Sequence, residues 1–222
     1  MKGGALNHVG FWAAASTAVL TAWFIAAFGP WIAGQPAWHG IDAFAKAFQV
    51  VPYVAWVIPC LFLALIFPVM LSTIHFVTAP ERRIWSWLGL MFGAFYGAVL
   101  GAVYWVILTV VPSSISSGDL QGLAPLVVTS PHSLANALEG IGYGFMGLAT
   151  LFAGLAVESG GLRSWIRWLL VANGTAGLVG VVLGGIGIVV ATMVALVVWA
   201  VTLPVAMVVL AVFFRRRLRS AG

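Results

Sequence analysis

Charged residues are scarce in this chain. Only 7% of its 222 residues are Asp, Glu, Lys or Arg, whereas 63% are hydrophobic, and the mean hydropathy is +1.11. A soluble domain carries about 25% charged residues. This chain has too few charges to cover a surface in contact with water, so the composition predicts an integral membrane protein.

Cysteine and the common catalytic motifs are also lacking. The single cysteine, Cys60, excludes a framework of disulfides, and its apolar surroundings in the sequence favour a small buried hydrophobe. The chain contains no nucleotide-binding loop, no nucleophile elbow and no His-Glu-x-x-His motif. The net charge of +5 does not indicate nucleic acid, because the basic residues lie at the ends of apolar runs.

Long apolar runs dominate the chain. A helix needs about 20 apolar residues to cross a membrane, and five runs reach that length: 9–31, 50–77, 85–111, 133–157 and 165–214. The last would extend over about 70 Å as one helix, against a hydrocarbon core of about 30 Å. We expect it to break at the glycines of residues 184–187 into spans 165–184 and 188–214. The run 9–31 is too long for a signal peptide and predicts a retained span.

The distribution of charge supports six spans. Six spans place both termini on one side, together with nine of the ten basic residues: Lys2, Arg82, Arg83, Arg163, Arg167, Arg215, Arg216, Arg217 and Arg219. Only Lys46 lies on the other side. The positive-inside rule then predicts a protein of the plasma or inner membrane with both termini in the cytoplasm.

The fold class predicted from these patterns is an all-α integral membrane protein, a six-transmembrane-helix bundle that forms one domain over residues 1–222. Residues 37–49 predict a short amphipathic helix in the outer interface, with Phe44 on its apolar stripe and Asp42 and Lys46 on its polar one. Residues 112–131 predict an outer loop, either a lid or a connector. Ser130 and Pro131 predict the start of the fourth span.

Glycine recurs at regular intervals in three spans. In lipid, helices associate through close contact of small residues, so these glycines predict tight helix packing. The predicted packing positions are Gly89, Gly93, Gly97 and Gly101 in the third span and Gly177, Gly180 and Gly184 in the fifth. The fifth span also carries Asn173, expected to bond to a neighbouring span. A homo-oligomer is expected if the glycine face of the third span contacts lipid.

Tryptophans near the ends of spans predict an interfacial belt. Its members are Trp12, Trp31, Trp38, Trp85, Trp87, Trp165 and Trp168. Such a belt anchors the protein in the membrane.

Glu139 is the strongest candidate for a functional residue. It lies about two turns into the fourth span, where an ionisable side chain is costly and points to function by default. His132, Asn136 and Tyr143 fall within the same arc of that helix, and Tyr104 in the third span lies at a similar depth. These residues predict either an outer-facing pocket that binds a proton or a small ligand, or a neutral acid that joins helices by hydrogen bonds.

Histidines offer weaker alternatives. His8 and His75 lie toward one side of the membrane and His39 and His132 toward the other, a distribution that could ligate haem. His39 and His132, with nearby carboxylates, could instead hold a metal ion. We expect neither cofactor.

Three classes of function remain open. The first is a small transporter or permease-like protein with an outer-facing polar pocket around Glu139, acting on an unidentified small molecule. The second is a non-catalytic accessory or assembly subunit of a larger membrane complex. The third, a haem- or metal-dependent membrane redox enzyme, is the least favoured.

Overall fold

A computed structural model of the chain describes residues 4–220, which contain helices and no strand. Within that range six helices are long and apolar enough to cross a membrane. They are α1 (Gly4–Ala33), α3 (Val50–Val77), α4 (Arg83–Ser117), α5 (Leu134–Ala156), α6 (Leu162–Gly185) and α7 (Val189–Arg219). Each coincides with one predicted span, which confirms an all-α, six-helix, multi-pass membrane protein. Lys2, part of the predicted charge pattern, lies outside the described residues.

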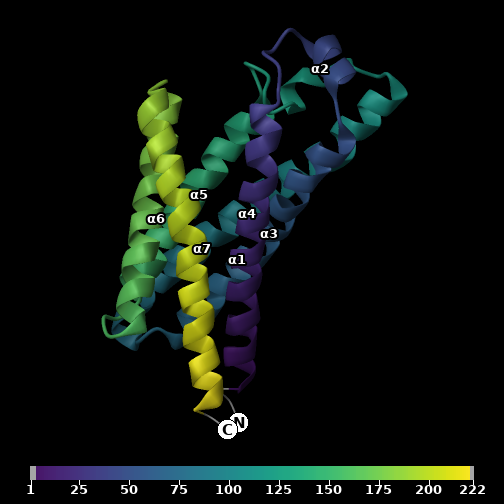
Figure 1. Cartoon of the computed structure of the whole chain (residues 1–222). Helices are drawn as coiled ribbons and strands as arrows, with labels where there is room; N and C mark the ends of the chain where they lie inside the picture. The colour runs from purple at the N-terminus through teal and green to yellow at the C-terminus, as the bar shows by residue number, and fades with distance from the viewer. Residues whose placement is uncertain (1–3, 221–222) are drawn as a thin grey trace.

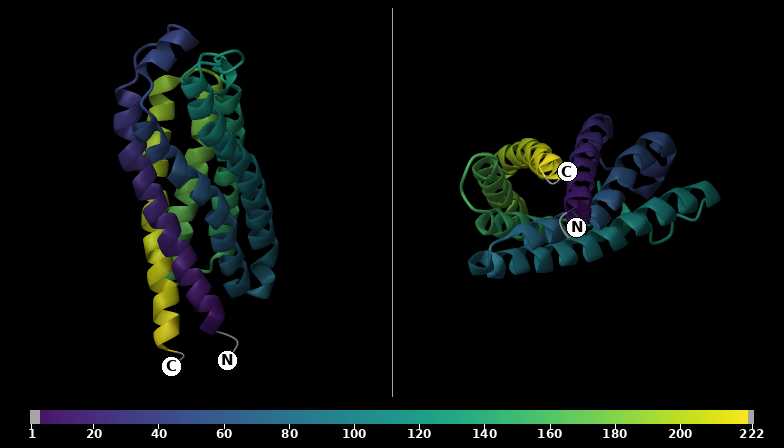
Figure 2. Two further views of the ribbon diagram at one scale, coloured as in Figure 1. Left: turned by 90° about the vertical axis from the view of Figure 1, so that its right-hand side faces the viewer. Right: turned by 90° about the horizontal axis from the view of Figure 1, so that it is seen from below.

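The six long helices form a closed ring. Each packs against the next long helix along the chain, and α7 packs against α1. The view from below in Figure 2 shows α1 between α7 and α3. The interior of the bundle is therefore enclosed by side chains from all six helices.

The two ends of the bundle differ in charge. The start of α1 and the end of α7 lie at the same end (Figure 1), together with the α3–α4 and α5–α6 connections. All eight arginines of the chain belong to these segments, and we call this the arginine-rich end. The opposite end carries the short helices α2 (Ile41–Ala47) and η2 (Ala124–Leu126) and the α6–α7 turn.

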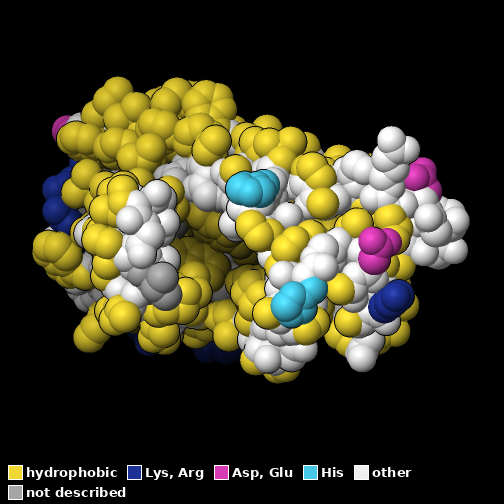
Figure 3. All heavy atoms as spheres, turned by 90° about the horizontal axis from the view of Figure 1, so that it is seen from above, with side chains coloured by type: hydrophobic (Ala, Val, Ile, Leu, Met, Phe, Trp, Pro, Cys, Tyr) yellow, Lys and Arg dark blue, Asp and Glu magenta, His cyan; other side chains and the backbone are white. Residues whose placement is uncertain are grey.

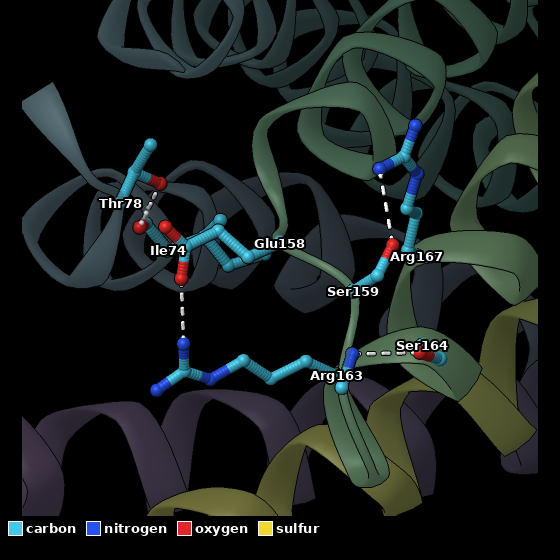
Figure 4. Close-up of polar contacts among 8 residues, drawn as sticks. Ile74, Thr78, Glu158, Ser159, Arg163, Ser164 and Arg167 are labelled. Carbon is cyan, nitrogen blue, oxygen red and sulfur yellow. Dashed lines mark hydrogen bonds and ion pairs between the residues drawn. The ribbon is translucent and has the colours of Figure 1, made fainter. Parts of the chain in front are cut away.

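Polar contacts at the arginine-rich end hold the α5–α6 connection (Figure 4). Arg163 donates a hydrogen bond of 2.7 Å to Glu158, and Arg167 lies 3.4 Å from the Ser159 hydroxyl. The backbone N–H of Gly160 donates to Ser164 Oγ over 2.8 Å. Glu158 and Arg163 thus form an ion pair at the start of α6. Because both side chains are more than 40% exposed, the pair contributes little to stability.

Helix α4 is longer than the sequence pattern predicts. It continues through Pro112 to Ser117, six residues beyond the predicted end, and stops at Gly118 with φ 75°. The hydroxyls of Ser113 and Ser116 donate to backbone carbonyls one turn earlier in the helix. The serine side chains therefore satisfy their hydroxyls within the helix, and the positive φ of Gly118 ends it.

Helix α5 begins three residues later than predicted. Its N-cap is Ser133, whose hydroxyl accepts a 2.9 Å hydrogen bond from the backbone N–H of Asn136. The prediction of Ser130 as the cap was wrong, because Ser130 lies in a turn that accepts the N–H of Ser133. His132 consequently precedes the helix.

The amphipathic segment forms α2, with the expected polarity. Phe44 is buried, and its ring lies 6.1 Å from that of Trp38 and 5.7 Å from that of Phe48. Asp42 and Lys46 are exposed, and no ion pair joins them.

The four glycines of α4 face different neighbours. A Cβ atom added to Gly89 would lie 3.1 Å from the carbonyl oxygen of Ala149 in α5. A Cβ atom added to Gly97 would lie 2.8 Å from the carbonyl oxygen of Ala64 in α3. Gly93 also faces α3, and Gly101 has no heavy atom within 4 Å of the Cβ position. Each step of four residues rotates the face by about 40°, so the row passes from one neighbour to the next. The first three glycines are covered by other helices and are not available to a second copy of the chain.

The closest approach in α6 involves Gly174, a glycine that the sequence did not single out. Its Cβ position lies 2.5 Å from the Gly147 carbonyl oxygen of α5. Among the predicted positions, Gly177 also faces α5, while Gly180 and Gly184 face α7. Asn173 donates to the Trp199 carbonyl (3.0 Å) and the Thr202 hydroxyl (3.1 Å) of α7, which confirms the expected bond between spans.

Candidate functional site

Glu139 is the one acidic residue of the chain that lies within a long helix. The other four, Asp42, Glu81, Asp119 and Glu158, lie in short helices or connections. Glu139 lies about 8 Å along the axis of α5 from the first residue of that helix, Leu134. It is in the half of the bundle farther from the arginine-rich end. Its Oε1 atom is buried and has no hydrogen-bond partner. A buried polar atom without a partner is costly. Within residues 4–220, four other side chains carry such an atom (Asn7, Trp56, Arg167 and Asn173), and Glu139 is the one carboxyl group among the five.

Tyrosine hydroxyls gather around this carboxyl. The Tyr104 hydroxyl lies beside it, and 3.0 Å from the Tyr143 hydroxyl. Tyr53 donates to the backbone carbonyl of Ile107 over 3.3 Å, which joins α3 to α4. All four tyrosines of the chain and its single cysteine are electrostatic neighbours of Glu139: Tyr53, Tyr96, Tyr104, Tyr143 and Cys60. Sparse polar groups from α3, α4 and α5 are thus concentrated at one site.

A closed series of aromatic side chains occupies the same level of the bundle. We call it the aromatic collar, and its members are Trp56, Tyr104, Tyr143, Trp199, Phe24 and Phe28. Ring centroids lie 6.4 Å apart for Trp56 and Tyr104, and 5.6 Å apart for Tyr143 and Trp199. Phe24 lies 6.4 Å from Trp199, and Phe28 lies 5.1 Å from Phe24 and 5.3 Å from Trp56. The hydrogen bond between Tyr104 and Tyr143 closes the series, which draws on five of the six long helices.

The collar also contains a donor without a partner. Trp56 is 1% exposed, and its indole Nε1 makes no hydrogen bond. A buried indole N–H normally finds an acceptor. One unpartnered donor, Trp56 Nε1, thus lies in the collar, and one unpartnered acceptor, Glu139 Oε1, belongs to the carboxyl beside its member Tyr104.

Two predicted site residues lie apart from this group. His132 and Asn136 are exposed, although they share an arc of the helical wheel with Glu139. His132 precedes the N-cap Ser133, and Asn136 lies in the first turn of α5, so the arc extends past the enclosed part of the bundle. Glu139, Tyr143 and Tyr104 are the predicted residues that the structure brings together.

The histidines do not converge on a metal site. Among residues 4–220 no group of three or more His, Cys, Asp or Glu side chains lies close enough to hold a metal ion. His8 is exposed, and His75 Nδ1 lies 2.8 Å from the Ser86 hydroxyl.

Sequence reasoning missed the tryptophans of the collar. Trp199 lies near the middle of the predicted span 188–214, and Trp56 is the seventh residue of the span 50–77, so both are further inside their spans than an anchoring tryptophan at a span end. That position was the available signal. Trp31, assigned to the interfacial belt, is instead 7% exposed and packs on Tyr53 and Trp56, with centroids 5.9 and 5.1 Å away.

The bundle is looser between α1 and α7 toward the opposite end. At the arginine-rich end Phe214 fills the space over Gly10, whereas beyond Trp199 the α7 residues Val194 and Val197 are more than 60% exposed. Figure 1 shows α1 and α7 diverging in this direction, and Figure 3 shows the opposite end hollowed beside the α6–α7 tip. Hydrophobic side chains line the visible hollow in Figure 3.

Comparisons with known proteins give no match: no family model, no curated protein and no solved structure matches the chain. The function must therefore be argued from the residues of the site.

Proposed function

We propose that this protein is a small permease-like membrane protein that binds a small molecule at Glu139, in the outer half of its bundle. The positive-inside rule places the arginine-rich end in the cytoplasm. The opposite end, the hollow beside α7 and the Glu139 site then face the outside of the cell membrane. Glu139, Tyr104 and Tyr143 supply the polar contacts of the site.

The observation that carries this proposal is the unpartnered Oε1 atom of Glu139. An accessory subunit whose interior polar groups only hold helices together would use this carboxyl to bond a neighbouring helix. Other residues do that here, since Tyr104 bonds Tyr143 and Asn173 bonds α7. A carboxyl that lies beside tyrosine hydroxyls, with one buried oxygen left without a protein partner, supports the binding of a ligand or a proton.

Chemical modification of Glu139 tests the proposal. Dicyclohexylcarbodiimide is a hydrophobic reagent that couples to protonated carboxyls in apolar sites. We expect the full-length protein in lipid nanodiscs to form an adduct at Glu139, detected by peptide mass spectrometry. Glu139→Gln should abolish that adduct. The matched variant Glu158→Gln, which alters the exposed ion pair at the other end of the bundle, should leave it intact.

Stability measurements on the same variants separate binding from structure. Because the Glu139 Oε1 atom has no protein partner, Glu139→Gln is expected to change the free energy of unfolding by less than the loss of one hydrogen bond, about 1 kcal/mol. Thermal or denaturant unfolding in detergent measures this change. An absent adduct together with a large loss of stability would overturn the proposal in favour of a structural carboxyl.

A further inference from the structure

We infer that the Glu139 site takes an organic cation, of the class of quaternary or alkylated ammonium ions, which enters between α1 and α7. This inference rests on the proposed function and names the chemistry of its ligand. It is carried by the charge balance at the site, by the aromatic collar and by the shape of the bundle.

No basic side chain accompanies Glu139. Its electrostatic neighbours are hydroxyls and one thiol, and the one ion pair within residues 4–220 joins Glu158 to Arg163 at the arginine-rich end. Lys46, the basic residue at the opposite end, is exposed on α2. An ionised Glu139 thus has no counter-ion from the protein, so a cationic ligand would be attracted and an anionic one repelled.

The collar suits a cation that carries apolar groups. The faces of Trp, Tyr and Phe rings attract ammonium ions, most strongly where water is excluded. Two tryptophans, two tyrosines and two phenylalanines meet at the level of the carboxyl, and Trp56 and Tyr104 are each 1% exposed. A small inorganic cation would need several oxygen ligands, which a set of mostly apolar rings does not supply.

The contact between Phe24 and Trp199 is the natural point of entry. The rings of the collar touch one another, so a ligand must separate one pair of them. Phe24 and Trp199 join α1 to α7, the two helices that are far apart in sequence and diverge toward the opposite end. Leu196, one turn from Trp199 on that side, is 49% exposed. The hollow of Figure 3 lies beside this part of α7.

Protection of Glu139 from dicyclohexylcarbodiimide tests the inference with defined probes. Tetraethylammonium and choline serve as cations, and 3,3-dimethyl-1-butanol serves as the uncharged counterpart of choline, with carbon in place of nitrogen. At ten times its dissociation constant, a bound cation is expected to slow adduct formation about tenfold by mass action. The uncharged alcohol and sodium chloride at matched ionic strength should give no protection.

Collar variants show where the probe binds. Trp199→Leu should abolish protection by the cations, whereas Trp165→Leu, at a side chain that is 66% exposed, should preserve it. Phe28→Leu provides a second collar variant if Trp199→Leu does not fold. Adduct formation that no cation slows, or that the alcohol slows equally, would overturn the organic-cation inference and leave the proposed function standing. If Glu139 forms no adduct at all, the proposed function itself fails.

Discussion

At the scale of single residues, the interior polar groups divide into two kinds. Asn173 Nδ2, Tyr53 and the pair Tyr104–Tyr143 make hydrogen bonds between helices, while Glu139 Oε1, Trp56 Nε1, Asn7 Oδ1 and Asn173 Oδ1 have no partner among the described residues. In a membrane, such interhelical bonds contribute modestly to stability, about 0.6 kcal/mol on average. An unpartnered carboxyl has no such benefit to offset its desolvation, and this contrast singles out Glu139.

The Tyr104–Tyr143 bond gives a prediction at this scale. Tyr143→Phe removes one hydroxyl of the pair without emptying the ring position, and is expected to lower the free energy of unfolding by about 0.5–1.5 kcal/mol. Tyr104→Phe should have a similar effect, and the double variant should cost little more than either alone. Denaturant unfolding in detergent measures the cycle. Fully additive losses would show that the two hydroxyls do not stabilise each other.

At the scale of the helix, small residues decide which elements approach closely. The glycines of α4 recur every four residues, a spacing slightly longer than one turn. Gly89 therefore faces α5, whereas Gly93 and Gly97 face α3. Helices α5 and α6 meet most tightly where Gly147 and Gly174 face each other. The repeat in sequence therefore reports close packing in general, while the partner changes from one glycine to the next.

Two glycines of α4, four residues apart, form a matched test. A Cβ on Gly97 would lie 2.8 Å from the Ala64 carbonyl oxygen, so Gly97→Ala should destabilise the bundle by about 1–3 kcal/mol through overpacking. Gly101 has open space around it, and Gly101→Ala should be neutral or stabilise by up to about 1 kcal/mol, because alanine is the better helix former. Unfolding of the two variants side by side measures the difference. Equal effects would contradict the assignment of α4 faces.

At the scale of the whole molecule, the closed ring determines what can be enclosed. Contact of α7 with α1 unites the two ends of the chain and completes the wall around Glu139. Phe214 of α7 packs over Gly10 of α1 near the arginine-rich end, and Figure 1 shows the two helices diverging toward the other end.

The orientation of the ring in the membrane is a separate prediction. With the arginine-rich end cytoplasmic, alkaline phosphatase fused after Arg219 should be inactive, while the same enzyme fused after Asp119 should be active. Green fluorescent protein fused at the two positions should give the converse pattern. Activity in the reverse pattern would put the Glu139 site on the cytoplasmic side and remove the outer-facing part of the proposed function.

The sequence by itself determined the number of membrane-spanning helices and the approximate position of each. Those features depend on local properties, since a span must satisfy its own backbone and match the thickness of the bilayer. Glu139 was recognisable for the same reason, because a charge inside a long apolar run is conspicuous without any knowledge of its neighbours.

Only the tertiary structure decided which faces of the helices meet. Lipid and protein interior are equally apolar, so hydropathy does not distinguish a tryptophan that anchors the protein from one that is buried. Trp31 was assigned to the interface and is buried, Trp56 and Trp199 went unnoticed, and Asn136 lies outside a site whose helical arc it shares. The collar exists because five helices bring six aromatic residues together, and no one segment of the chain contains that information.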